Sequence, residues 1–213
     1  MSMGWRLASR LSVVILALLV VLVVAVYSLH NNTSAPAATT PSVNDSGLQG
    51  INLDSTPAPD FHLKDQFGKQ ISLSQFKGRP TIVTFLYTHC PNVCPLVADK
   101  LHLVVQALGK DAPHVAILAV SMDPKGDTVS TALNFSRVHK LVNSWHFLVG
   151  TLNQLAPVWS SYTVDAQAAT SSGIVTHSTF IYVIDKEGRE RVLLDDDFTV
   201  PQLTGDLKIL LTE

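Results

Sequence analysis

Three short apolar runs constrain the fold of this chain most strongly. They are Thr81–Thr88, Val115–Ser121 and Thr179–Asp185, and each is rich in β-branched and aromatic residues. Runs of this length and composition predict buried strands. Between the first two runs, apolar residues recur at helical spacing, at Val97, Leu101, Val104, Val105 and Leu108. A strand–helix–strand pattern of this kind predicts an α/β fold whose sheet is covered by helices.

The remaining patterns complete one α/β domain with a central mixed sheet flanked by helices. The further expected elements are a hairpin over residues 61–63 and 71–73, helices at 128–140 and 151–162, a strand at 146–149, a hairpin partner of the third strand at 191–194, and a last helix from 199 to 211. The helices at 151 and 199 each begin with a threonine, a residue that favours the N-cap. In such sheets, functional sites form beyond the carboxyl ends of the strands. The loops 88–95 and 121–127 and the loop that ends at His177 are therefore the candidate positions.

The N-terminus carries an uncharged run of nineteen residues, Leu11 to Leu29. A helix of about 20 apolar residues spans a bilayer, so we expect one transmembrane anchor here. Arg6 and Arg10 precede the run, and the first charged residue after it is Asp45. This asymmetry favours a single-pass plasma-membrane protein with residues 1–10 in the cytoplasm and the rest outside. A cleaved signal peptide is the alternative, although its apolar region is normally about 7–15 residues long.

Residues 30 to 57 are rich in Ser, Thr, Asn, Ala and Pro and show no helical or strand period. We therefore expect a flexible tether between the anchor and a folded domain over residues 58–213. A coil of roughly 30 residues has an end-to-end distance of roughly 30 Å. The domain would then search the space close to the membrane.

Composition excludes several classes of function. Charged residues make up 15% of the chain, and 15 basic against 17 acidic residues give a net charge of −2. No basic stripe exists that could neutralise phosphates, so nucleic-acid binding is not expected. Two cysteines are too few for a disulfide-dense scaffold or a four-cysteine zinc site. Eight histidines leave a mixed cysteine–histidine site open.

Both cysteines lie between the first strand and the helix that follows it. Because Pro95 has no N–H, it must lie in the first turn of that helix, which places the N-cap between Asn92 and Cys94 without deciding between them. Both thiols then face the positive end of the helix dipole, which favours thiolate. The spacing allows Cys90 and Cys94 either to chelate one ion or to close as a disulfide. Two thiolates suit Cu(I), and a neutral imidazole is the natural third ligand. A purely structural disulfide and a pair of inert buried cysteines are the alternatives.

The stretch Phe85–Pro95 resembles the Sco/SenC family of copper chaperones, whose fold is thioredoxin-like. Val120–Pro124 and His177–Asp185 match further motifs of the same family, and the resemblance runs over about residues 58 to 211. One departure is Asn92, which stands where the family commonly has Asp and removes a negative charge beside the thiols. This departure bears on metal affinity and redox potential rather than on ligation.

The resemblance implies that Cys90, Cys94 and His177 bind copper and that the two cysteines form a redox pair. It also implies that Asp123 lies near the metal without binding it. Members of the family deliver copper to the binuclear copper site of cytochrome c oxidase, or reduce the cysteines of that site. The implied partners are the copper-site subunit of the oxidase or another copper protein, together with a thiol reductant.

His177 also has an argument of its own. It precedes the third strand at the place where thioredoxin-like proteins have a cis-proline facing the cysteines, so an imidazole can occupy that space. His89 adjoins Cys90, but we expect the strand to direct its ring away. The other histidines are expected on the surface or packed, and Asp195–Asp197 is expected to be a solvated turn.

Three other functions compete with a copper chaperone. The first is an extracytoplasmic thiol–disulfide oxidoreductase without a metal role. The second is a thiol peroxidase, because residues 58 to 78 resemble the opening of peroxiredoxins. However, Tyr87 and Pro91 stand three residues before the two cysteines, where a peroxidase needs a threonine hydroxyl. The third is a redox sensor that signals to a membrane partner.

Overall fold

The computed structural model describes residue 16 and residues 18–25, 47–164 and 179–213. The chain divides into two units, residues 1–40 and 41–213. In the first unit, residues 18–25 are helical and their apolar side chains are exposed. Within these described ranges, no helix has both the length and the apolar character that a membrane span requires. Most of the predicted anchor, residues 11–29, lies outside the described residues.

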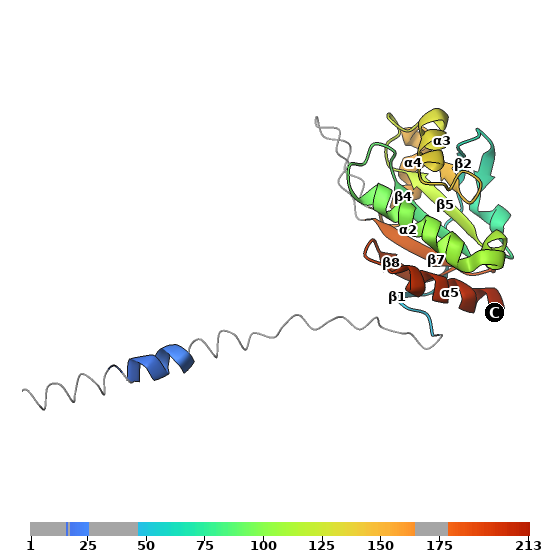
Figure 1. Ribbon diagram of the computed structural model, residues 1–213. Coiled ribbons are helices and arrows are strands. Elements are labelled where there is room, and N and C mark those ends of the chain that lie inside the picture. Colours follow the sequence, from blue (N-terminus) through green and yellow to red (C-terminus); the bar gives the residue numbers. More distant parts are fainter. Residues whose placement is uncertain (1–15, 17, 26–46, 165–178) are drawn as a thin grey trace, which may run out of the picture. The chain divides into compact units, whose positions relative to one another are not determined.

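The second unit is built around a six-stranded mixed sheet with the strand order β1-β8-β7-β4-β5-β6 (Figure 1). The strands are β1 (Ile51–Pro57), β4 (Thr81–Leu86), β5 (Ala116–Ser121), β6 (His146–Leu148), β7 (Phe180–Ile184) and β8 (Arg189–Asp195). The strands β4, β5 and β6 are parallel, whereas β7, β8 and β1 join by antiparallel pairing. Every residue of β4 and β5 is buried, as expected for strands covered on both faces. The predicted mixed sheet is confirmed.

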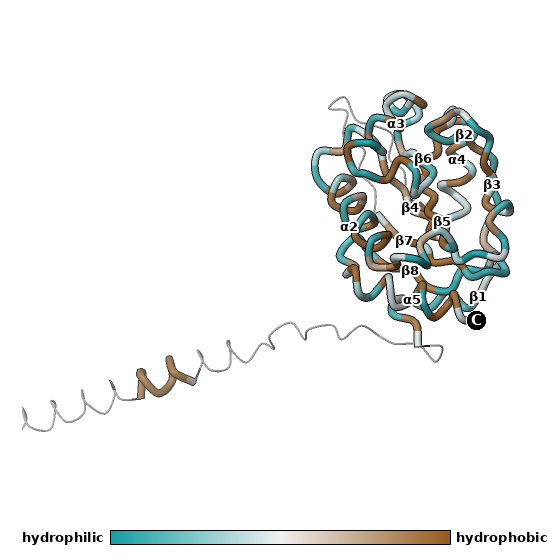
Figure 2. Tube along the Cα trace, turned by 45° about the vertical axis from the view of Figure 1, so that its right-hand side comes forward, coloured by the Kyte–Doolittle hydropathy of each residue, from teal (hydrophilic) through white to brown (hydrophobic). Residues whose placement is uncertain are grey.

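Helices cover the sheet from both sides. They are α2 (Val93–Leu108), α3 (Val129–Val138), α4 (Leu152–Ser161) and α5 (Val200–Thr212), with short 3-10 helices η1 (Leu73–Phe76) and η2 (Gly109–His114). Figures 1 and 2 show α2 and α5 side by side on one face of the sheet and α4 on the other. A separate hairpin of β2 (His62–Lys64) and β3 (Gln70–Ser72) matches the predicted one. The helix α2 connects the parallel strands β4 and β5, as the sequence predicted.

The helix boundaries follow from capping residues that the sequence shows. The Thr128 hydroxyl accepts a hydrogen bond from the Thr131 N–H at 3.1 Å, which starts α3. The Thr199 hydroxyl accepts from the Gln202 N–H at 3.3 Å, which starts α5. The helix α2 ends at Leu108, and the C-cap residue Gly109 has a φ of 56°, in the left-handed region that favours glycine.

The strand β1 differs from the sequence expectation, which assigned residues 30–57 to an irregular tether. Residues 51–57 instead pair with β8, with Ile51 opposite Leu193 and Pro57 opposite Arg189. The register shifts between Asn52 and Thr56, because two intervening residues have positive φ. The neighbouring strand supplies the hydrogen bonds, so β1 forms without alternating apolar residues. Leu48, before this strand, is also fully buried. The tether expectation is therefore wrong for residues 48–57.

An aromatic cluster joins α4 to the centre of the sheet. The ring of Tyr162 lies 5.5 Å from that of Phe85 and 5.0 Å from that of Tyr182. The Tyr182 hydroxyl donates to the carbonyl of Tyr162, and the Tyr162 hydroxyl donates to the carbonyl of Pro59 at 2.9 Å. Tyr162 precedes the segment 165–178 and Tyr182 follows it. The cluster therefore fixes the chain on both sides of the segment that contains His177.

Candidate metal and redox site

The two cysteines lie where β4 passes into α2. Cys90 is in the connecting loop, and Cys94 is the second residue of the helix, which begins at Val93. Asn92 is the N-cap residue, although its side chain makes no capping hydrogen bond. Pro95 falls in the first turn, as its missing N–H requires. The structure thus decides the N-cap position that the sequence left open.

The start of α2 directs a backbone N–H at the first sulfur. The N–H of Cys94 donates to Cys90 Sγ at 3.4 Å. Both cysteines are free thiols, Cys90 partly exposed and Cys94 buried. Since the helix dipole favours negative charge at its N-terminus, this position stabilises a Cys90 thiolate. Cys90 is consequently the sulfur that a partner molecule can reach.

The two thiols have opposite acidities. A hydrogen bond from the Cys94 thiol, assisted by the N–H groups of Cys94 and Asn92, lowers the pKa of Cys90 from 9.0 to about 5. The same hydrogen bond, together with burial, raises the pKa of Cys94 well above its ordinary range. At neutral pH the pair therefore holds one thiolate and one proton, which suits it both to nucleophilic attack and to soft-metal binding.

A buried carboxylate, Asp127, ties the loop after β5 to the cysteine loop. Its Oδ1 accepts hydrogen bonds from the N–H and the hydroxyl of Thr88 at 2.9 and 2.7 Å. Its Oδ2 accepts from the Ser121 hydroxyl at 2.6 Å. Burial raises the pKa of Asp127, and these hydrogen bonds oppose that effect. Because Thr88 lies two residues before Cys90, this carboxylate positions the first cysteine.

The sequence analysis predicted that the loop 121–127 contributes to the site, but it assigned no role to Asp127. The loops 88–95 and 121–127 meet, as predicted for loops at the carboxyl ends of neighbouring parallel strands. Asp127 had no predicted role, although its place directly before the N-cap Thr128 was a usable signal. Asp123 lies in the loop as predicted, where its Oδ1 accepts from the N–H groups of Lys125 and Gly126 at 3.1 and 2.9 Å. Its expected place beside a metal stays a prediction.

His89 faces the carboxylate loop. Its Nδ1 lies 3.1 Å from the Thr88 hydroxyl oxygen. One ligand atom each of His89, Asp123 and Asp127 lie within 4.8 Å of one another. These three side chains form a group of potential metal ligands that the sequence analysis did not predict.

His177 lies outside the described residues, so the predicted set of Cys90, Cys94 and His177 stays a prediction. The strand that follows it is described. The antiparallel strand β7 pairs with β4, with Ile181 opposite Thr84 and Ile184 opposite Thr81. The N-terminal end of β7 therefore lies at the carboxyl end of β4, where the cysteine loop begins.

The other polar candidates form contacts of their own. Hydrogen bonds join His62 to Ser72, His102 to Gln106, His139 to Asp99 and His146 to Asp65. His114 is exposed. These positions agree with the predicted surface or packed roles. In the acidic turn, the Asp195 carboxylate accepts from the Asp197 N–H at 3.1 Å.

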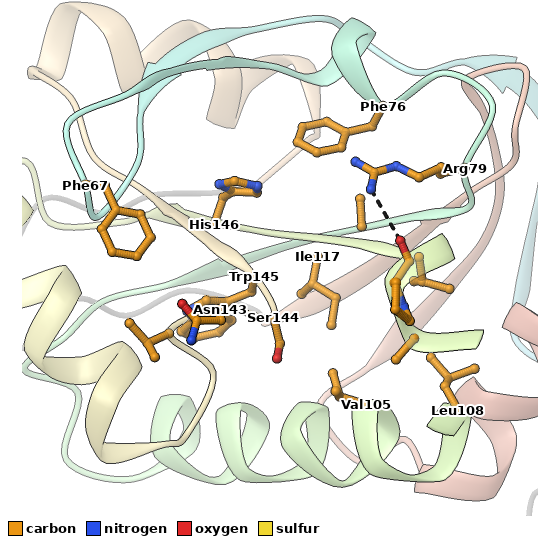
Figure 3. A pocket seen from close by; sticks show the side chains of 15 residues that line it. Phe67, Phe76, Arg79, Val105, Leu108, Ile117, Asn143, Ser144, Trp145 and His146 are labelled. Atoms are coloured by element: carbon orange, nitrogen blue, oxygen red, sulfur yellow. Dashed lines mark hydrogen bonds between the residues drawn. The ribbon is translucent and has the colours of Figure 1, made fainter. Parts of the chain in front are cut away.

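A cavity of about 480 Å³ lies at the opposite end of the sheet (Figure 3). Its walls include Ile117 near the start of β5, and the Arg79 guanidinium donates to the Pro113 carbonyl at 3.4 Å. Neither cysteine lines this cavity. The two cysteines lie instead at the end of the sheet where β4 and β5 terminate.

Comparison with known proteins identifies the family to which this arrangement belongs. The sequence profile of the SCO1/SenC family matches residues 51–212. The chain belongs to the SCO1/SenC family. The match includes β1, the strand that the sequence analysis had placed in the tether, and the predicted thioredoxin-like fold is confirmed.

Relatives of this SCO1/SenC chain include proteins from mitochondria and bacteria. The bovine mitochondrial SCO2 homologue is 32% identical over an alignment of 139 residues, and the match covers 61% of this chain and 50% of the relative. The chain thus spans about half the length of the mitochondrial relatives it matches. Copper-bound ScoI of Bradyrhizobium japonicum is 34% identical with a TM-score of 0.65, over 73% of this chain and all of that one. BsSco, described as a member of the Sco family of cytochrome c oxidase assembly proteins, shares the fold at 22% identity and a TM-score of 0.66, over 77% of this chain and 99% of that one.

Proposed function

We propose that this chain is a membrane-tethered copper chaperone that takes part in the assembly of the binuclear copper site of cytochrome c oxidase. Copper binds through the sulfurs of Cys90 and Cys94 and the imidazole of His177. The recipient is the copper-site subunit of the oxidase or another copper protein. Membership of the SCO1/SenC family and the similarity to copper-bound ScoI support this proposal.

The observation that carries the proposal is the pair of free thiols at the start of α2. Soft sulfur ligands select Cu(I) over harder divalent ions. Cys90 is already a thiolate at neutral pH, and the adjacent Cys94 thiol loses its proton when the metal binds. Two thiolates supply two ligands of a trigonal site and leave one position for an imidazole.

The register of β7 supports His177 as that third ligand. Thr179 and Phe180 lie at the end of the sheet from which the cysteine loop leaves. His177 is two residues before Thr179, a separation of roughly 7 Å at most along the chain. This short connection to the end of β7 is why we propose His177 as the third ligand.

A Cu(I) titration of the reduced full chain against a competing chelator tests the ligand set. We expect one tightly bound Cu(I), and a weaker affinity after His177→Ala. His114→Ala is the matched control, because His114 is exposed and lies before β5 rather than beside the cysteines. Equal Cu(I) affinities of the His177→Ala and wild-type chains would contradict the three-ligand site.

We further propose that residues 11–29 anchor the chain in the plasma membrane, with residues 1–10 in the cytoplasm. Residues 30–46 act as the tether, since Leu48 is already buried in the domain. The domain lies on the extracytoplasmic side. The uncharged run and the two arginines before it support this topology. Protease added to intact spheroplasts should digest the domain, and alkaline carbonate should leave the chain in the membrane. A domain protected from protease would contradict this topology.

A second function, thiol–disulfide exchange, is favoured by the opposite acidities of the thiols. The Cys90 thiolate attacks a partner disulfide, a new S–S bond forms, and the released partner sulfur takes up a proton. Cys94 then loses its proton and attacks the Cys90 sulfur, which releases the second partner sulfur as a thiol. Two electrons pass to the partner, and a Cys90–Cys94 disulfide remains until an external thiol reductant restores the pair.

Metal content and reduction kinetics distinguish the two functions. Chain purified under reducing conditions should contain copper if the chaperone role holds. An oxidoreductase without a metal role would instead reduce a disulfide substrate in copper-free form and bind Cu(I) only in the micromolar range.

A further inference from the structure

We propose that His89, Asp123 and Asp127 form a second cation site beside the thiols, which binds a divalent ion such as Cu(II) through one nitrogen and two carboxylate oxygens. The site itself follows from the geometry of these three residues. Its assignment to copper rests on the proposed copper function.

The donor atoms converge from two loops. His89 follows β4, and the two aspartates follow β5, yet one ligand atom from each lies within 4.8 Å of the others. This is the only such group within the described ranges 47–164 and 179–213. An imidazole and two carboxylates favour divalent ions such as Cu(II) over Cu(I), which prefers sulfur. The two neighbouring sites therefore differ in the oxidation state that each favours.

The lone pairs of the carboxylates leave room for an ion. Asp127 Oδ2 accepts one hydrogen bond, from the Ser121 hydroxyl, and retains a second lone pair. Asp123 uses Oδ1 for the N–H groups of its own turn, which leaves Oδ2 for the ion. Each carboxylate can thus bind metal without losing the bonds that hold its loop.

The local charge also favours a cation. The Asp127 residue is buried, with an exposed fraction of 5%. Within the residues that the structure describes, neither Asp123 nor Asp127 forms a salt bridge with lysine or arginine. Two neighbouring carboxylates, one of them buried, therefore have no cationic partner, and a divalent ion would supply one.

Gly126 keeps the space between the donors open. A Cβ atom at this position would lie 2.2 Å from Asp123 Oδ2 and 3.3 Å from His89 Nδ1. Any side chain there would displace the carboxylate oxygen. The donors can approach one ion only because residue 126 is glycine.

The His89 side of the site opens to solvent. A hollow of about 550 Å³ between the start of α2 and the length of α3 is lined by His89, Thr88, Pro95 and Thr131, among others. Its walls contain no lysine or arginine. A hydrated cation therefore has a path to the imidazole that does not pass the buried Cys94.

Cu(II) titration followed by electron paramagnetic resonance tests the site in the full chain held in detergent. The Cys90→Ser/Cys94→Ser double variant removes the sulfur ligands. We expect one Cu(II) with nitrogen and oxygen ligands, and an affinity that falls roughly 10-fold or more when His89→Ala or Asp123→Asn is added, because each change removes one ligand. His114→Ala in the same background should leave this Cu(II) affinity unchanged, because His114 is exposed and lies before β5.

Two results would overturn the second site. One is the absence of Cu(II) binding in the double variant, and the other is equal Cu(II) affinity with and without His89→Ala. A Cu(I) titration of the chain with intact cysteines separates this failure from failure of the chaperone role. Normal Cu(I) binding combined with either result would overturn the second site alone.

Discussion

The loops after β4 and β5 lie side by side, but the first offers a metal ion sulfur ligands and the second offers carboxylate oxygens. The first presents two sulfurs, one of them a thiolate held by the start of a helix. The second presents two carboxylates, one of them buried and bonded to Thr88 of the first loop. Parallel neighbouring strands bring these loops together, because both strands end at the same edge of the sheet. One edge can therefore hold a soft site and a harder site whose positions depend on each other.

The largest expected effect comes from removing a sulfur. Cys94→Ala should lower the Cu(I) affinity of the reduced chain by roughly 1,000-fold, about 4 kcal/mol, because one soft ligand is lost. A chelator competition titration measures the change, and Asp123→Asn serves as the comparison from the other loop. Similar losses of Cu(I) affinity in both variants would show that Cu(I) binding does not depend specifically on the cysteine loop.

The thiolate of Cys90 should react selectively at low pH. Its lowered pKa predicts iodoacetamide labelling with a midpoint near pH 5, rather than near 9.0. At pH 6 an ordinary thiol is ionised to roughly one part in 300, whereas Cys90 is mostly thiolate. Because a thiolate of lower pKa is also a weaker nucleophile, Cys90 should be labelled on the order of 10-fold faster. Mass spectrometry of labelled peptides identifies the site. A Cys90 midpoint near pH 9 would mean that the helix start does not hold a thiolate.

The lowered pKa of Cys90 also makes the free energy of unfolding depend on pH. The Cys90 pKa is lower in the folded than in the unfolded chain, so its contribution to the free energy of unfolding is full above the ordinary pKa. It is lost as the pH falls through about 5. Reduced wild-type chain should therefore gain stability relative to Cys90→Ser between pH 5 and pH 9 in denaturant titrations. Parallel pH profiles for the two proteins would contradict this assignment.

Loss of the carboxylate that joins the loops should have a smaller effect. Asp127→Ala removes the acceptor for Thr88 and Ser121, which should lower the free energy of unfolding by about 1–3 kcal/mol. Asp127→Asn keeps one oxygen and should cost less. Asp197→Ala, at an exposed position, is the control. Equal stability of Asp127→Ala and this control would show that the carboxylate does not hold the loops together.

The smallest expected effect is a change in Cu(II) affinity that concerns only the second site. Gly126→Ala should reduce Cu(II) affinity roughly 10-fold, about 1.4 kcal/mol, because the new Cβ displaces an Asp123 oxygen. The Cu(I) affinity of the cysteine pair should not change. A parallel loss of both affinities would indicate that the loop has collapsed as a whole.

The sequence predicted those strands whose burial requires apolar residues and those helices whose first residues favour an N-cap. The strands β4, β5 and β7 are apolar runs, and threonine marks the starts of α3, α4 and α5. The edge strand β1 was missed because its pairing comes from β8 rather than from a pattern of its own. Its residues, INLDSTP, include a register shift and no buried position.

The candidate site was predicted in part for a similar reason. The two cysteines are visible because adjacent prolines and a strand–helix boundary mark them. Asp127 was missed because its role depends on a hydrogen bond to Thr88, 39 residues away in sequence, which no local pattern shows. The orientation of His89 toward the aspartates likewise follows only from the three-dimensional contact of two loops.

X-ray absorption at the copper edge of the Cu(I)-loaded full chain tests the central claim most directly. We expect two sulfur scatterers and one imidazole nitrogen, and loss of the nitrogen in His177→Ala. A nitrogen signal that persists in His177→Ala, or copper bound by sulfur alone in the wild-type chain, would contradict it.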